Sequence, residues 1–164
     1  METKTLVKDK SGKFPTEEHN SVDEMMVNFK GKSTIKQYIR GKPNPWGFKL
    51  WGRAGISGFL YDFDVYQGAS QNKSSELGVG GDIVMKLTET LEGGKKYKIF
   101  ADNYFTSIKL AMALKERSMF YVGTVMSNRL KGPLKPKELK KEGRGTSDYR
   151  VDESEKLIVV RWYF

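Results

Sequence analysis

The stretch YKIFADNYFTSI, at residues 97–108, joins a short apolar run to a polar turn and then to the start of a second apolar pattern. The apolar run predicts a buried strand that ends at Ala101. Thr106 or Ser107 predicts the start of a helix, because a hydroxyl at this position accepts a hydrogen bond from an amide of the first turn. Asp102 therefore lies where a predicted strand gives way to a predicted helix.

Three further strands are expected before this stretch. Residues 23–29 alternate between two faces, which predicts a first strand with Asp23 on the same face as three apolar side chains. Residues 47–53 and 59–66 predict a second and a third strand. The run GISG at residues 55–58 predicts the hairpin turn that joins them.

Two helices and two more strands complete the prediction. Asp82 is expected to cap the first helix, which ends at glycines 93–94. Its apolar stripe consists of Ile83, Val84, Leu87 and Leu91. The second helix follows Ser107, residues 121–126 predict a fifth strand, and residues 157–164 predict a last one that the chain end cuts short.

The resulting order, β-β-β-α-β-α-β, predicts an α/β fold with a mixed sheet and flanking helices. A right-handed helical crossover places the fourth strand beside the first. This is the layout of a ribonuclease H-like fold. It would bring Asp23, in the first strand, and Asp102, at the end of the fourth, onto neighbouring strands.

The charge of the chain is strongly positive and unevenly distributed. Its 164 residues carry 29 Lys and Arg against 20 Asp and Glu, a formal net charge of +9. Residues 25–61 contain no acidic side chain, and residues 129–144 hold seven Lys or Arg against two Glu, with Pro133 and Pro136 expected to break regular structure. This balance favours a polyanionic partner, and the alternative is a soluble basic protein without one.

Composition excludes several classes of protein. There is no cysteine, which rules out disulfides and thiolate metal sites. No apolar run approaches the roughly 20 residues that span a bilayer, and the N-terminus lacks a signal-type apolar stretch. We therefore expect an intracellular, soluble protein with no membrane partner. We divide the chain into a polar segment at 1–20, a core at 21–128, and a basic loop with the start of insertion strands at 129–164.

A pair of aspartates on neighbouring strands suits phosphodiester chemistry. Two Mg²⁺ ions about 3.5–4 Å apart activate the attacking oxygen and stabilise the leaving one, and such hard cations take carboxylate ligands. The alternative for either Asp23 or Asp102 is a cap, a turn or a solvated strand position. The sequence pattern by itself leaves both interpretations open.

Several blocks of the sequence resemble piggyBac-type transposases, in the same order and without large gaps. The resemblance extends over roughly residues 21–163 and is densest at residues 101–108. The matching blocks include Ser21-Val22-Asp23-Glu24-Met25-Met26-Val27, Trp46-Gly47-Phe48-Lys49-Leu50-Trp51, Glu76-Leu77-Gly78, Ala101-Asp102-Asn103-Tyr104-Phe105-Thr106-Ser107-Ile108 and Gly143-Arg144-Gly145. Several blocks at consistent spacing are more specific than a single motif.

The resemblance implies a DDE/D transposase, which cuts DNA at the ends of an element and joins them to a target. It implies that Asp23 and Asp102 are catalytic metal ligands for Mg²⁺ or Mn²⁺, and that DNA is the partner. The family's third acidic position, its auxiliary aspartate and its cysteine-rich tail would lie beyond residue 164. We therefore expect a fragment truncated before the final catalytic helix, with weak metal binding and negligible activity alone, so enzyme status stays uncertain. A nuclear location, a homodimer in the full-length family and no small-molecule cofactor are also expected.

The resemblance and the charge pattern together nominate DNA-binding residues. These are Lys30, Lys32, Lys36, Arg40, Arg129, Lys131 and Arg144, with a solvated basic loop as the alternative. Lys49 is expected only to lie along the strand edge, and Asp62 and Asp64 to face solvent. The aromatics Trp46, Trp51, Tyr104 and Phe105 are expected in the core, with stacking on a flipped base as the alternative.

Three hypotheses about the function follow from these observations. The first is a catalytic or DNA-binding fragment of a transposase-derived protein. The second is a domesticated protein that binds DNA without chemistry. The third is a gene remnant whose product has no role.

Overall fold

The computed structural model describes residues 14–68, 74–130 and 136–163. The chain divides into two compact units, Met1–Met126 and Ser127–Phe164, which are described separately. Within the described ranges, no helix is long and apolar enough to cross a membrane.

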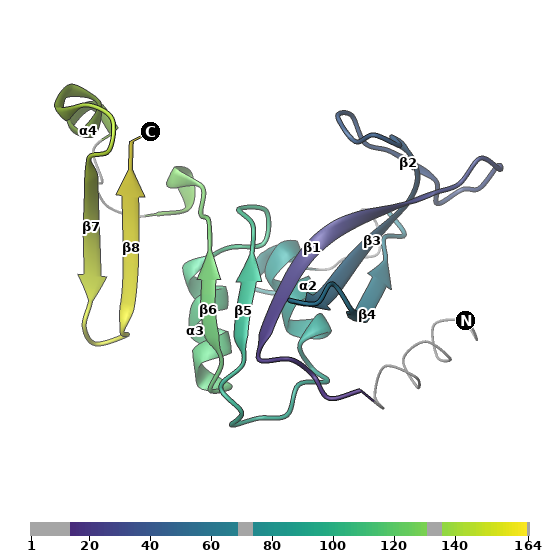
Figure 1. Cartoon of the computed structure of the whole chain (residues 1–164), viewed down its shortest axis with the longest axis horizontal. Helices are drawn as coiled ribbons and strands as arrows, with labels where there is room; N and C mark the ends of the chain where they lie inside the picture. The colour runs from purple at the N-terminus through teal and green to yellow at the C-terminus, as the bar shows by residue number, and fades with distance from the viewer. Residues whose placement is uncertain (1–13, 69–73, 131–135, 164) are drawn as a thin grey trace. The chain divides into compact units, whose positions relative to one another are not determined.

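The first unit is built on a mixed sheet in which the strands follow the predicted order (Figure 1). Its strands are β1 (His19–Asn28), β2 (Gln37–Tyr38), β3 (Trp46–Gly55), β4 (Leu60–Val65), β5 (Lys98–Ala101) and β6 (Phe120–Gly123). They run in the order β2-β3-β1-β5-β6, and β4 pairs with β3. The expected position of the fourth predicted strand beside the first is confirmed, because β5 pairs with β1, in parallel. The two-residue strand β2 was not predicted.

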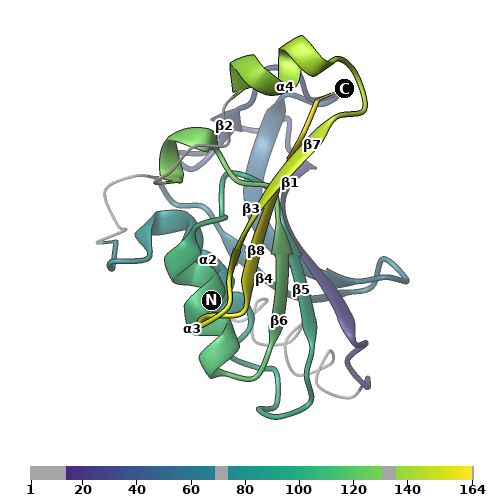
Figure 2. The same cartoon turned by 90° about the vertical axis from the view of Figure 1, so that its left-hand side faces the viewer.

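Two helices cover one face of this sheet, as Figure 2 shows. They are α2 (Gly78–Leu87) and α3 (Ile108–Glu116). The core between helices and sheet consists of apolar side chains that alternate along the strands, including Val22, Trp51 and Ile99. The predicted cap of the second helix is confirmed, since Ser107 Oγ accepts a hydrogen bond from the amide of Leu110 over 3.1 Å.

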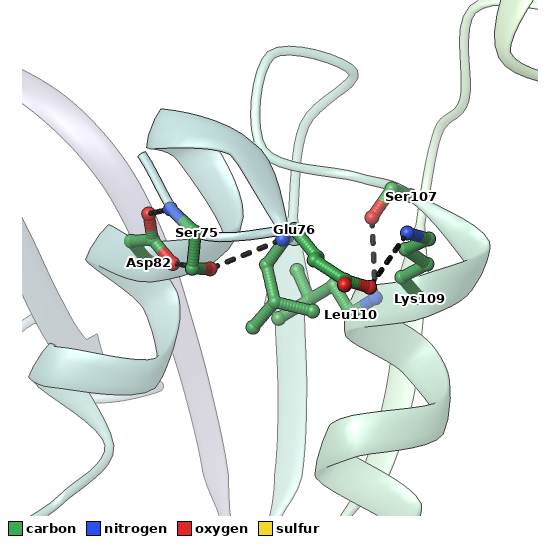
Figure 3. A network of polar contacts seen from close by, with 7 residues as sticks. Ser75, Glu76, Asp82, Ser107, Lys109 and Leu110 are labelled. Atoms are coloured by element: carbon green, nitrogen blue, oxygen red, sulfur yellow. Dashed lines mark hydrogen bonds and ion pairs between the residues drawn. The ribbon is translucent and has the colours of Figure 1, made fainter. Parts of the chain in front are cut away.

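The predicted cap of the first helix is wrong. Helix α2 begins at Gly78, four residues before Asp82. Asp82 instead lies within the helix and accepts hydrogen bonds from the amide and the hydroxyl of Ser75 (Figure 3). Nearby, Lys109 of α3 lies 3.1 Å from a carboxylate oxygen of Glu76, so the beginnings of both helices are joined by polar contacts.

The prediction that Asp62 and Asp64 face solvent is also wrong. The register between β3 and β4 shifts at Arg53/Ala54, and Tyr61 and Asp62 are consecutive buried residues. A β-bulge of this kind changes the face on which the following side chains lie. Asp62 lies opposite Arg53 and is 3% exposed, and Asp64 forms an ion pair with Lys86 of α2.

The second unit is small. It contains η2 (Ser127–Arg129), α4 (Pro136–Glu142) and a two-stranded antiparallel sheet of β7 (Ser147–Asp152) and β8 (Leu157–Trp162). The expectation that residues 129–144 form only a loop is wrong, because α4 begins at Pro136. Proline is well tolerated in the first turn of a helix, where its missing amide has no partner to lose. The predicted last strand is present as β8.

Candidate metal and nucleic-acid site

Asp23 lies in the middle of β1, between Val22 and Glu24. Val22 is 1% exposed and faces the helices, so alternation along the strand places Asp23 on the opposite face, where it is exposed. Its Oδ1 accepts a hydrogen bond of 2.7 Å from the amide of Glu24. This contact orients the carboxylate with respect to its own backbone.

Asp102 is the first residue after β5 and begins the turn that leads into α3. Its Oδ1 accepts a hydrogen bond of 2.8 Å from the amide of Tyr104. Its carbonyl oxygen accepts from the amide of Thr106 over 3.2 Å and from the hydroxyl of Thr106 over 2.7 Å. The turn is therefore held by three hydrogen bonds, and the Asp102 side chain is exposed.

The parallel pairing of β1 with β5 brings the segments that carry these two aspartates together. Val22 and Ala101 are the last register partners of the two strands. Asp23 and Asp102 are the residues that directly follow them. Neighbouring strands are about 4.8 Å apart, so the two residues emerge side by side where β5 ends.

Such a pair has the chemistry to hold a hard divalent cation, because both groups offer carboxylate oxygens. Each carboxylate has one oxygen held by a backbone amide. Among the described residues no hydrogen bond to the second oxygen of either one is present. The same part of the chain contains no cluster of three or more acidic, histidine or cysteine side chains that would hold a metal ion. The described residues therefore offer two carboxylates at this position.

The charge of Asp102 affects the pKa of a neighbouring phenol, that of Tyr121. Burial raises the pKa of the Tyr121 hydroxyl, the hydrogen bond with Thr106 opposes this shift, and the charge of Asp102 adds to it. The Tyr121 and Thr106 oxygens are 2.7 Å apart. A neutral phenol and a hydroxyl thus support the turn from the side of β6.

The predicted DNA-binding lysines follow β1. Lys30, Lys32 and Lys36 line one open hollow, and Arg40 is exposed in the same acid-free window. Arg129 and Arg144 are exposed in the second unit. Lys131 lies outside the described residues. The lysines of the first unit therefore share one surface, while the predicted arginines of the second unit belong to a separate body.

Comparison with known proteins identifies the family. A family model described as Transposase IS4 matches residues 4–164. Human PiggyBac transposable element-derived protein 2 is 42% identical over 154 residues, which cover 91% of this chain and 26% of that protein. The chain belongs to the piggyBac transposase family.

Two further similarities agree with this piggyBac assignment. Human PiggyBac transposable element-derived protein 3 is 39% identical over 90% of this chain and 26% of that protein. A cryo-EM structure of a piggyBac transposase synaptic complex with hairpin DNA superposes with a TM-score of 0.76 at 28% identity, covering 90% of this chain and 31% of that chain. The chain thus spans about a quarter of the length of the curated piggyBac relatives.

Two charged residues that support the site of this piggyBac chain were not predicted. The ammonium of Lys49 lies 2.7 Å from Glu24, which follows Asp23, and 4.1 Å from the centroid of the Trp51 ring. Tyr104, from the Asp102 turn, stacks on Trp51 with centroids 5.3 Å apart. Lys49 was expected to lie along the strand edge. Instead, its ammonium group lies against side chains of β1, β3 and the Asp102 turn. Its position opposite Met26 on an inner strand depends on the register of β1 and β3, which no local sequence signal indicates.

Among the four aromatics expected in the core, two are more exposed than predicted. Trp51 and Phe105 are each 2% exposed, as expected. Tyr104 is 41% exposed, although one face of its ring lies on Trp51. Trp46 is 53% exposed at the start of β3.

Proposed function

We propose that this chain forms part of the catalytic core of a DDE/D-type DNA transposase with a ribonuclease H-like fold. Asp23 and Asp102 act as two of its metal ligands. The observation that supports this proposal is the parallel pairing of β1 and β5, which ends at Val22 and Ala101, so that Asp23 and Asp102 are the next residues of two neighbouring strands.

The residues of this chain would hold and orient the cation rather than carry out proton transfer. Backbone amides fix one oxygen of each aspartate, and the ion pair between Lys49 and Glu24 joins β3 to the strand that carries Asp23. A bound Mg²⁺ or Mn²⁺ pair supplies an activated oxygen nucleophile and stabilises the leaving oxygen. The exposed face at Asp23 gives a DNA backbone access to this position.

The chain alone is expected to show negligible strand transfer. Two carboxylates bind a divalent ion weakly, with water filling the other positions. Holding two ions for in-line displacement requires more ligands than the described residues supply. A misplacement near 1 Å costs about a hundredfold in rate. In a full-length protein of this family, we propose metal-dependent DNA cleavage and strand transfer, carried out by a homodimer in the nucleus.

The metal proposal is tested by isothermal titration of Mn²⁺ into the wild-type chain and into Asp23→Asn and Asp102→Asn variants. Weak binding to the wild type that disappears in both variants is the expected result. Asp148→Asn, in β7 of the second unit, is the matched control and should bind as the wild type does. Equal heats in all four proteins would exclude Asp23 and Asp102 as the ligands.

The activity proposal has a separate test. Supercoiled DNA is incubated with the chain and Mg²⁺, and nicking is followed on a gel. Robust nicking by the wild type that vanishes in Asp23→Asn would overturn the expectation that the chain is inactive. The proposal that Asp23 is a metal ligand would still hold.

The exposed lysines at the end of β1 favour a second candidate, a protein that binds DNA without performing chemistry. None of the ion pairs between described residues involves Lys30 or Lys32. Binding through phosphate contacts weakens steeply as salt rises. Salt-dependent DNA binding without any Mn²⁺ heat would favour this candidate over the catalytic one.

A further inference from the structure

An open hollow of about 550 Å³ lies where β1 ends, away from the two aspartates. Lys30, Lys32 and Lys36 line it, together with the ring of Trp46. The Lys36 ammonium donates to the carbonyl oxygen of Gly31 over 3.1 Å and lies 5.4 Å from the centroid of the Trp46 ring. The hollow thus combines cations with an aromatic surface.

Trp46, which lines the hollow, pairs with a second exposed ring from the neighbouring strand. Tyr38 of β2 and Trp46 of β3 are register partners, and their ring centroids are 4.9 Å apart at an interplanar angle of 53°. Both side chains are large and apolar, yet they are 55% and 53% exposed. Tyr38 and Trp46 lie outside the main hydrophobic core. Packing in the core of the first unit therefore does not explain why two large aromatic side chains are paired here.

The surroundings of the hollow are positive. No acidic side chain occurs between residues 25 and 61. The preceding carboxylate, Glu24, is already engaged by Lys49 at 2.7 Å and by Lys42 at 3.7 Å. The charges of Lys30 and Lys32 are therefore not offset by an ion pair within the described part of the chain, and an anionic ligand fits this hollow.

We propose that the hollow binds an unpaired nucleotide of a DNA strand, with the base stacked on Trp46 and the flanking phosphates on Lys30 and Lys32. Aromatic rings bind single strands because every base has a stacking face, and basic grooves follow the backbone. In a duplex, the base faces are already stacked on each other and only the phosphates are available. The exposed ring pair therefore favours an unpaired strand over a duplex. This inference rests on the proposed function in one respect only, which is that DNA is the partner.

The position of the hollow separates it from the metal site. Asn28 lines the hollow and lies five residues beyond Asp23 on the same strand. At about 3.3 Å per residue, this places the two sites about 17 Å apart. A nucleotide bound at Trp46 is therefore not the one whose phosphate lies at the aspartates. The hollow would hold a displaced or flanking part of the strand.

The test compares binding of the 164-residue chain to a fluorescein-labelled oligothymidylate and to a duplex of the same length by fluorescence anisotropy. Trp46→Ala should weaken single-strand binding about tenfold, since stacking on one aromatic ring contributes strongly to such complexes. Duplex binding should change less than about twofold, because it depends on phosphate contacts. Lys32→Ala should weaken both and lower the slope of log affinity against log salt by about 0.7–0.9.

Three controls make the result specific. Trp162→Ala removes a tryptophan of similar exposure, 52%, from the second unit and should change neither affinity. Trp46→Phe keeps a stacking ring, so single-strand affinity should stay within about threefold while the quenching of tryptophan fluorescence by the strand is reduced. Thermal unfolding of each variant checks that the sheet is retained.

The outcomes are distinct from those of the metal proposal. Equal losses on single strand and duplex in Trp46→Ala, or no loss on either, would overturn the nucleotide hollow. If Mn²⁺ binding is absent but Trp46→Ala still loses single-strand affinity, the catalytic proposal fails and this inference stands.

Discussion

The guanidinium of Arg53, in β3, donates a 2.7 Å hydrogen bond to the carbonyl oxygen of Leu87, the last residue of α2. It also donates to Asn20 of β1 over 2.7 Å and to Thr90 over 2.9 Å. Arg53 is 2% exposed, and this burial lowers its pKa while the neighbouring Asp62 charge opposes the shift. One buried side chain therefore joins two strands to the end of a helix.

Replacing Arg53 with methionine is expected to destabilise the chain by about 3 kcal/mol. The substitution removes three donors and leaves the Asp62 carboxylate without the guanidinium that offsets its burial. Urea unfolding measures the change. Arg150→Met, at an exposed position of β7, is the control and should cost less than about 0.5 kcal/mol. A loss below about 1 kcal/mol for Arg53→Met would show that the network contributes little.

Gly80→Ala is expected to destabilise the chain by about 1–3 kcal/mol, although alanine is the better helix former. A Cβ at this position would lie 2.7 Å from the carbonyl oxygen of Tyr104 and 2.8 Å from the Cα of Phe105. Both are backbone atoms of the turn after Asp102, so α2 or the turn must move. Thermal unfolding measures the effect. Gly93→Ala meets no atom within 4 Å and should be nearly neutral; similar losses in both variants would exclude the close approach as the cause.

Most of the sheet was predictable because its signals are local or topological. The GISG turn indicates a hairpin wherever it joins two alternating runs, and β3 and β4 follow from it. The crossover rule needs only the order of the elements, and it places β5 beside β1 and so Asp102 beside Asp23. The hydroxyl of Ser107 marks the start of α3 by its own chemistry.

The rest depended on contacts between residues far apart in the sequence. A single extra residue in β4 turns Asp62 inward, and alternation alone does not reveal a bulge. The side chain of Lys49 points inward because Glu24 on the adjacent strand neutralises its charge. Predicting this contact requires the register of β1 and β3. Trp46 was expected in the core because tryptophan is apolar. It is the first residue of β3 and is 53% exposed, beside the two-residue strand β2, which the sequence did not predict.

The Glu24–Lys49 pair should make the free energy of unfolding depend on pH in the acidic range. Burial raises the pKa of Glu24, but the charges of Lys49 and Lys42 outweigh this and hold it below its ordinary value of 4.5. A lowered folded-state pKa stabilises the native chain above the unfolded value, and this contribution is lost as pH falls through the lowered one. Glu24→Gln should therefore cost stability at about pH 6 and little at about pH 3.

Urea unfolding at both pH values measures this difference. Glu89→Gln, at an exposed position after α2, is the matched control and should give the same small change at both. If Glu24→Gln lowered stability equally at the two pH values, packing rather than charge would explain the role of Glu24.

The adjacent aspartates should destabilise the chain when no cation is present. Two like charges side by side on neighbouring strands cost about 0.2–1 kcal/mol. Asp102→Asn keeps the oxygen that accepts from the Tyr104 amide but removes the charge, so it should raise stability by about 0.5 kcal/mol in chelator. Asp23→Asn should do the same, and the double variant should gain no more than either single one, because the repulsion is removed only once.

Adding Mn²⁺ should reverse the order of stability of the wild type and the two single variants. A cation that binds only the folded state stabilises it by RT ln(1 + [L]/Kd), so the wild-type midpoint should rise while those of the two variants stay constant. Thermal unfolding in chelator and in excess Mn²⁺ separates the two effects. If the single variants gain stability additively and the wild type does not respond to Mn²⁺, then Asp23 and Asp102 neither repel each other nor share an ion, and the two carboxylates do not form one site.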